Sequence, residues 1–150
     1  MKPILVGESN PYSQDPDDAL LPWPFGCAGW RLCHKVLALR EETYLATFDR
    51  ANLLDRGRWS APMARASATK LLDDHDVLVL LGRKVCDAFN QGGAVPGHRR
   101  VLLVGERERV LVRLPHPSGR SRAWHDPTME RRCRDVLREV LPDIPFGEVK

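Results

Sequence analysis

The segment RLPHPSGRSRAW, residues 113–124, gathers side chains that could do chemistry. Two prolines flank His116, and two serines alternate with two arginines directly behind it. An imidazole can donate or accept a proton near neutral pH, and guanidinium groups pair with phosphate. Many segments rich in proline and glycine are ordinary surface turns. The alternative is a rigid loop that presents a histidine to an anionic substrate.

Other polar side chains follow apolar runs that are typical of buried strands. Glu8 and Asn10 come just after the run ILVG, and Asn52 lies within the segment ANLL. In open α/β sheets, ligands bind outside the carboxyl ends of the strands. We therefore expect these residues and His116 to lie at one edge of a sheet, where they would form a site.

The elements that must position these residues alternate between strand and helix. Strands are expected at 3–6, 47–54, 76–81, 100–105 and 109–115, and helices at 28–40, 60–74, 83–90 and from Asp126 onward. The unbroken apolar run DVLVLL is typical of a parallel strand that is buried on both faces. The pattern predicts a single domain over 1–150, a three-layer α/β/α sandwich with a central, mostly parallel four-stranded sheet.

Length and composition are those of an ordinary globular domain. The chain has 150 residues, of which 43% are hydrophobic and 29% charged. No apolar run approaches the roughly 20 residues of a membrane span, and the N-terminal run is too short for a signal peptide. We expect a cytoplasmic monomer with no membrane partner.

The positive charge is concentrated in the second half of the chain. Residues 1–75 contain nine Lys or Arg and ten Asp or Glu, whereas residues 76–150 contain fourteen and ten. The excess is nearly all arginine, which binds phosphate through a bidentate fork. This distribution favours a nucleic-acid partner, although a solvated surface rich in ion pairs would give the same pattern.

The four cysteines lie within apolar patterns and form no CxxC pair. We interpret them as reduced thiols of the core. The nearest approach to a metal motif is Cys27, Cys33 and His34, but two adjacent residues cannot face the same side of a helix. We expect neither a metal site nor a cofactor.

Five segments together resemble the uracil-DNA glycosylase superfamily. In chain order they are GESNPY, PFGCAG, ANLL, VLVLLG and HPSGRS, and they span residues 4–124. HPSGRS is similar to the superfamily's HPS loop, which grips the DNA backbone and carries the catalytic histidine. NPY is similar to the DPY and NP forms of the first motif, GES to its GE form, and PFGCAG to PFVGRAG.

This resemblance implies a monofunctional DNA glycosylase that hydrolyses the N-glycosidic bond of a flipped-out uracil or related deaminated base, for base-excision repair. His116 would hydrogen-bond the base carbonyl where negative charge develops. Phe25 would stack on the base, and Asn52 would read its edge. Gly7, Ser9 and Tyr12 would line the same pocket, with Tyr12 crowding a thymine methyl. The implied DNA-binding residues are Ser118, Gly119, Arg120, Ser121 and Arg122.

The chain departs from the superfamily pattern at three points. The first motif is one residue longer between its glycine and proline than in several branches, so both Glu8 and Asn10 are candidates to hold the attacking water. Arg120 stands where the wedge of the HPS loop is often apolar. The cysteine spacing differs from that of the branch that binds an iron–sulfur cluster, so we expect no cluster.

Two other functions fit the same residues. One is a protein that binds DNA or a base without turnover, because the amide of Asn10 activates water less well than a carboxylate. The other is an enzyme that cleaves small nucleosides or nucleotides. The arginine-rich second half favours polymeric DNA, because a monomer needs few phosphate contacts. The base and the preference for single or double strands stay open.

Overall fold

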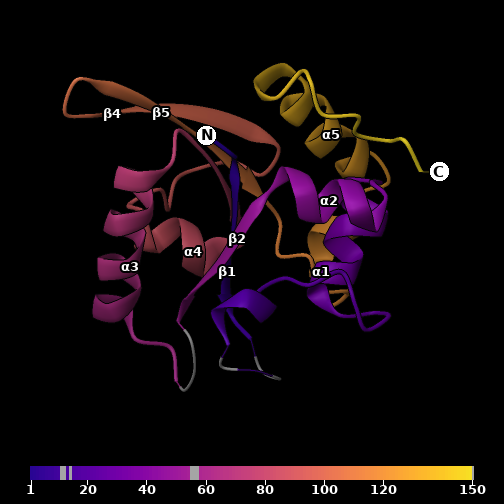
Figure 1. Cartoon of the computed structure of the whole chain (residues 1–150), viewed down its shortest axis with the longest axis horizontal. Helices are drawn as coiled ribbons and strands as arrows, with labels where there is room; N and C mark the ends of the chain where they lie inside the picture. The colour runs from indigo at the N-terminus through magenta and orange to yellow at the C-terminus, as the bar shows by residue number, and fades with distance from the viewer. Residues whose placement is uncertain (11–12, 14, 55–57, 150) are drawn as a thin grey trace.

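A five-stranded sheet forms the centre of the chain, as the computed structural model shows for residues 1–10, 13, 15–54 and 58–149 (Figure 1). The strands run in the order β2-β1-β3-β5-β4 across the sheet. Their bounds are β1 (Ile4–Ser9), β2 (Asp49–Leu54), β3 (Val77–Leu81), β4 (His98–Val104) and β5 (Arg107–Leu114).

Four of these strands are parallel, and the fifth is not. β2, β1, β3 and β5 pair in parallel, so their carboxyl ends lie at the same edge of the sheet. β4 pairs antiparallel with β5 and forms the opposite border from β2. The α/β class and the mostly parallel sheet are confirmed. The strand number is five, because the turn after Val104 folds β4 back as an extra edge strand.

Helices cover both faces of the sheet. α3 (Ala61–Asp74) and α4 (Arg83–Ala88) lie on one side in Figure 1, and the other helices lie on the opposite side. That second layer comprises α1 (Ala28–Arg31), the π-helical turn η2 (Leu32–Val36), α2 (Glu41–Thr47) and α5 (Met129–Val140). Two short 3-10 turns, η1 (Pro16–Asp18) and η3 (Arg122–His125), belong to the connecting loops.

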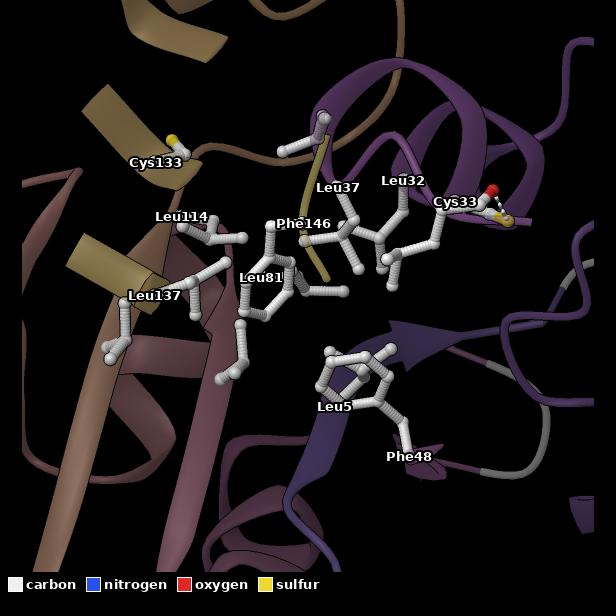
Figure 2. Packing of buried hydrophobic residues seen from close by; sticks show 14 of the residues in the cluster. Leu5, Leu32, Cys33, Leu37, Phe48, Leu81, Leu114, Cys133, Leu137 and Phe146 are labelled. Atoms are coloured by element: carbon white, nitrogen blue, oxygen red, sulfur yellow. Dashed lines mark hydrogen bonds between the residues drawn. The ribbon is translucent and has the colours of Figure 1, made fainter. Parts of the chain in front are cut away.

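Each face of the sheet has its own hydrophobic core. Leu5, Val79 and Leu114 pack toward the layer of α1, α2 and α5, and Figure 2 shows Leu5, Leu81 and Leu114 gathered with Leu37 and Leu137. The alternate residues of the same strands pack against α3 and α4; they include Ile4, Val6, Leu78, Leu80 and Leu111. Side chains alternate between faces with period two, so a strand buried on both sides must be apolar throughout. This explains the run VLVLL.

Some predicted boundaries are wrong. The expected helix over 28–40 ends with the turn at Val36, and Ala38 has a left-handed backbone with φ of 50°. A separate helix, α2, follows over residues that include part of the expected strand 47–54, which begins only at Asp49. The C-terminal segment packs at this break, where Gly147 N–H donates to the Leu37 carbonyl and Val149 N–H to the Ala38 carbonyl, both at 3.0 Å.

The four cysteines are free, and three of them lie in the core as expected. Burial raises the pKa of Cys33 to about 12, of Cys86 to about 11 and of Cys133 to about 12. Cys33 donates to the Leu39 carbonyl, whereas the neighbouring His34 ring bonds Glu41, so the two side chains have separate partners. Within the described residues, no group of His, Cys, Asp or Glu could hold a metal ion, and no helix could cross a bilayer.

Candidate active site at the carboxyl edge of the sheet

The segments expected to carry chemistry meet the sheet at its carboxyl edge. Asn52 of β2 lies beside Gly7 of β1 in register, and Gly82 follows the last residue of β3. His116 comes two residues after the end of β5. Because these four strands are parallel neighbours, the first motif, the ANLL segment and the HPS loop share one edge, as predicted from sequence.

Asn52 and Gly7 are in close contact. The Oδ1 atom of Asn52 lies 2.6 Å from the position that a Cβ atom on residue 7 would occupy, so a larger residue there would displace the carboxamide. Asn52 is half-buried, and its carboxamide has no hydrogen-bond partner among the described residues. A half-buried amide without a partner is suited to hydrogen-bond a ligand.

A loop that sequence analysis did not single out covers this end of β1. The Leu20 side chain approaches the same Gly7 position, at 3.3 Å. The buried Tyr44 hydroxyl donates to the Leu20 carbonyl at 2.7 Å, and Arg50 Nη1 donates to the Ala19 carbonyl at 2.8 Å. These long-range bonds make Leu20 part of the wall beside Asn52. From sequence, these bonds are indicated only by the general rule that a buried hydroxyl or guanidinium, such as those of Tyr44 and Arg50, requires a hydrogen-bond partner.

The loop also approaches α1 too closely for any side chain at residue 29. A Cβ on Gly29 would lie 2.0 Å from the Leu21 carbonyl oxygen, a contact that only glycine avoids. The glycine that ends PFGCAG therefore has a packing reason to be there. It lets the first turn of α1 lie directly against the loop at Leu20 and Leu21.

Glu8 and Asn10, the two candidates for holding water, differ in position. Glu8 belongs to β1 and alternates with Gly7, so its side chain lies on the α3 and α4 face with Val6, away from Asn52. Asn10 follows the strand and is half-buried. Its Nδ2 donates to the Asp18 carbonyl at 3.0 Å, which ties Asn10 to the loop that covers Gly7.

Three other residues of the expected pocket lie differently. Ser9 is exposed at the end of β1, and Tyr12 lies outside the described residues. Phe25 is 83% exposed, so it does not belong to the core. Its ring packs on Trp30, with 4.3 Å between centroids. Trp23 is also exposed, so the segment before α1 presents aromatic surface to solvent.

Backbone and side-chain hydrogen bonds hold the HPS loop. Ser118 N–H donates to His116 Nδ1 at 3.1 Å, and Ser118 Oγ accepts from Arg120 N–H at 3.2 Å. The Trp124 indole N–H donates to the His116 carbonyl at 2.9 Å, so Trp124 supports the loop. Ser121 N–H donates to the Ser118 carbonyl at 3.1 Å.

This network fixes the chemistry of the His116 ring. A ring nitrogen that accepts a hydrogen bond carries no proton, so the neutral imidazole of His116 carries its proton on Nε2. The ring also lies against Gly82, the residue after β3, since a Cβ on Gly82 would lie 3.2 Å from His116 Cβ and 3.4 Å from Cδ2 of the ring. Gly82 has φ of 93°, which favours glycine as well. His116 is thus a positioned hydrogen-bond donor.

Cationic side chains surround the loop. Arg120 and Arg122 are exposed, as expected for backbone contacts. The Arg31 guanidinium lies against Gly119, where an added Cβ would be 2.7 Å from Nη2. The Arg31 guanidinium makes no ion pair or hydrogen bond within the described residues, and sequence analysis did not single it out. Only the contact between α1 and the HPS loop identifies it as part of this surface.

No family model and no curated protein matches this chain. The residues at the carboxyl edge are therefore the basis for assigning a function.

Two hollows on the surface lie outside this group of residues. One, of about 490 Å³, lies between α3 and α4 and is lined by Trp59 and Lys84, whose Nζ is 5.7 Å from the Trp59 ring centroid. The other, of about 240 Å³, lies beside the β4–β5 hairpin. Neither is lined by Asn52 or His116.

Proposed function

We propose that this chain is a DNA glycosylase that hydrolyses the N-glycosidic bond of a flipped-out uracil or related deaminated base, in base-excision repair. The observation that carries this proposal is a pair of groups at one sheet edge. His116 is held with Nε2 as its donor, and Asn52 keeps a carboxamide without a partner among the described residues. Together they provide the hydrogen bonds that an excised base requires.

Asn52 supplies base recognition. Uracil presents an imide donor next to a carbonyl acceptor, and a carboxamide presents an acceptor next to a donor. The close contact of Asn52 Oδ1 with Gly7 limits how the amide can lie. A base whose edge has the opposite pattern would leave polar groups unpaired, which is the basis for strong discrimination.

His116 stabilises the leaving group. A water oxygen bonds to the anomeric carbon of the sugar while the carbon–nitrogen bond breaks, and the bonding pair stays on the base. The His116 Nε2–H group donates to the carbonyl oxygen where the negative charge develops. The proton that water loses is finally taken up by the departing base. No step assigned to these groups requires a metal ion.

Asn10 is the better candidate to hold the attacking water. Its side chain is anchored to the loop that covers Gly7, beside the base-reading Asn52. Glu8 lies on the other face of the sheet by strand alternation. Around the flipped nucleotide, Ser118, Arg120 and Arg122 bind backbone phosphates. Arg31, beside Gly119, adds a fourth contact.

The proposal includes a monomer that acts in the cytoplasm. The three buried, free thiols fit a reducing compartment. The groups assigned to the reaction all come from one chain, so the chemistry requires no second subunit. Elution from a calibrated gel-filtration column as a 17.0 kDa species would support the monomer, and elution at twice that mass would contradict it.

The test uses labelled oligonucleotides that carry uracil, hypoxanthine, cytosine or thymine at one position, as single strands and as duplexes. After incubation with the protein, alkali cleaves the strand wherever a base has been lost. We expect cleavage at uracil or hypoxanthine and its loss in His116→Ala. Intact strands for every base, with a well-folded protein, would reject the glycosylase.

The second candidate function is binding of a base or of DNA without turnover. The position of Glu8 favours it, because that carboxylate faces away from Asn52 and leaves an amide as the group beside the pocket. The same oligonucleotides distinguish the two functions. Retention of uracil-containing strands in a gel-shift assay, together with no alkali-sensitive sites, would favour the binding protein.

A further inference from the structure

A cavity of about 240 Å³ lies beside the β4–β5 hairpin and has a cationic lining. Leu80 and Leu111 form an apolar part of its wall, and Arg99, Arg100 and Arg113 line it as well. The remaining lining residues among those described are neutral or histidine, with no Asp or Glu. A concave site that combines apolar surface with several cations is suited to an anionic ligand.

The three arginines keep their charge without acidic partners. The ion pairs among the described residues use other arginines, at 107, 109, 132 and 138. Arg100 Nη1 donates instead to the Oε1 of Gln91 at 3.2 Å, and Gln91 is only 6% exposed. Arg113 Nη1 donates to the Ala94 carbonyl at 2.5 Å. These neutral acceptors orient the guanidinium groups and leave their positive charge unbalanced.

Arg113 also has an unused donor. Its Nε atom is buried and has no hydrogen-bond partner among the described residues. Buried donors in folded proteins are almost always satisfied, so this one is available to a bound acceptor. In register, Arg113 lies beside Leu80, so its side chain lies over the apolar part of the wall. An oxygen of a bound anion would complete the guanidinium hydrogen bonds there.

We propose that this cavity binds the phosphate group of a single nucleotide, either free or at the end of a DNA strand. Guanidinium forks match phosphate oxygens in geometry, and Leu80 and Leu111 accept the apolar surface of a sugar or base. The volume falls below the roughly 300–1,000 Å³ of pockets for drug-sized ligands, which suits one nucleotide. Because Arg113 shares a face with Leu80 and Leu111, the site lies on the α3 and α4 side, whereas Asn52 lies on the α1 side. The inference does not depend on the proposed glycosylase.

The experiment is a calorimetric titration of the whole chain with deoxythymidine monophosphate, with thymidine as the probe that lacks phosphate. We expect one binding site for the monophosphate and no measurable binding of thymidine. Arg113→Gln and Arg100→Gln should each weaken binding at least tenfold, because Arg100 of β4 pairs with Leu111 and lies on the same face as Arg113. Arg131→Gln removes the same charge from the exposed face of α5 and should change affinity less than twofold.

Two oligothymidylates, one with a 5′-phosphate and one with a 5′-hydroxyl, distinguish the sources of the phosphate. Displacement of the bound monophosphate by only the phosphorylated strand identifies a strand end, and displacement by neither identifies a free nucleotide. If Arg113→Gln unfolds, the variant of the exposed Arg100 decides. The proposal would be overturned if neither deoxythymidine monophosphate nor the 5′-phosphorylated strand binds saturably. It would also be overturned if Arg131→Gln loses as much affinity as Arg113→Gln does.

Discussion

The backbone N–H of Ser118 donates to His116 Nδ1, two residues earlier, at 3.1 Å. This short-range bond holds one nitrogen of the ring inside the loop and leaves Nε2 as the donor. The Trp124 indole holds the carbonyl of the same residue at 2.9 Å. Proline on either side limits the backbone further. A side chain so constrained fits a role in which it donates to a fixed oxygen atom.

Replacing His116 by alanine should lower the turnover of uracil-containing DNA by roughly 10²–10³, the scale of losing one oxyanion donor. Global stability should change little, because His116 is only partly buried. Single-turnover rates with the oligonucleotide assay, together with urea unfolding, measure both effects. His125→Ala is the matched control, since His125 is exposed a few residues later. Full activity of His116→Ala would remove the ring from the mechanism.

Asn10→Ala should reduce the rate of the chemical step more than the affinity for DNA. The reason is that a group holding the attacking water contributes mainly in the transition state. Glu8→Ala should be nearly normal, because strand alternation directs Glu8 to the opposite face. Rates at saturating DNA, and dissociation constants measured by anisotropy, separate the two effects. An inactive Glu8→Ala beside a normal Asn10→Ala would reverse the assignment.

The layers of the fold were predictable because local sequence patterns determine them. VLVLL must be buried on both faces, and the helices on either side of it supply those faces. The break at Ala38 was not predictable, because the carbonyls it exposes find their hydrogen-bond donors at Gly147 and Val149, at the far end of the chain. The sequence of residues 28–40 contains nothing that indicates a contact with a segment more than a hundred residues away.

The residues of the candidate site also fall into two groups, those that could be predicted from sequence and those that could not. Asn52 and His116 were predictable because strand ends and turn residues are local features. The roles of Leu20 and Arg31 were not, because each depends on a close approach between distant segments. Leu20 lies beside Gly7 with its carbonyl bonded to Tyr44 of α2, and the Arg31 guanidinium of α1 lies against Gly119 of the HPS loop.

Removing Arg120 and Arg122 together should make DNA binding less dependent on salt. Each phosphate contact contributes about one unit to the slope of log affinity against log salt concentration. The double alanine variant should therefore lose about two units, and its affinity should fall alike for all sequences. A variant with Lys70→Gln and Arg131→Gln removes equal charge from the exposed faces of α3 and α5. An unchanged slope in the loop variant would locate the DNA elsewhere.

The buried thiols should make the fold less stable in alkaline solution. Burial raises the pKa of Cys133 from 9.0 to about 12, so above pH 9 the unfolded chain loses a proton that the folded chain keeps. The stabilisation is fully present below pH 9 and is lost as the pH rises toward 12. Between pH 9 and pH 10.5 the unfolding free energy should fall by about 2 kcal/mol for one such thiol, at about 1.36 kcal/mol per pH unit.

Urea unfolding at pH 8 and pH 10.5 checks this expectation. Cys133→Ala should show a smaller alkaline drop in unfolding free energy than the wild type, although it is less stable at pH 8 because of the cavity. Cys27→Ala leaves all three buried thiols in place and should keep the wild-type drop. Equal drops in all three proteins would mean that Cys133 is not protected from ionisation.

Asn52→Asp tests the identity of the base, because it removes the amide donor and leaves acceptors only. Uracil excision should collapse, since an unpaired polar group in a partly buried site costs roughly 1–3 kcal/mol. Any weak excision of cytosine should rise, because a carboxylate can accept from the cytosine amino group. Uracil and cytosine oligonucleotides, tested on wild type and variant, give the ratio directly. Asn90→Asp adds the same charge at an exposed position after α4 and should leave that ratio unchanged. If Asn52→Asp removes uracil as fast as the wild type does, the carboxamide beside Gly7 does not read the base, and the pocket must lie elsewhere along the sheet edge.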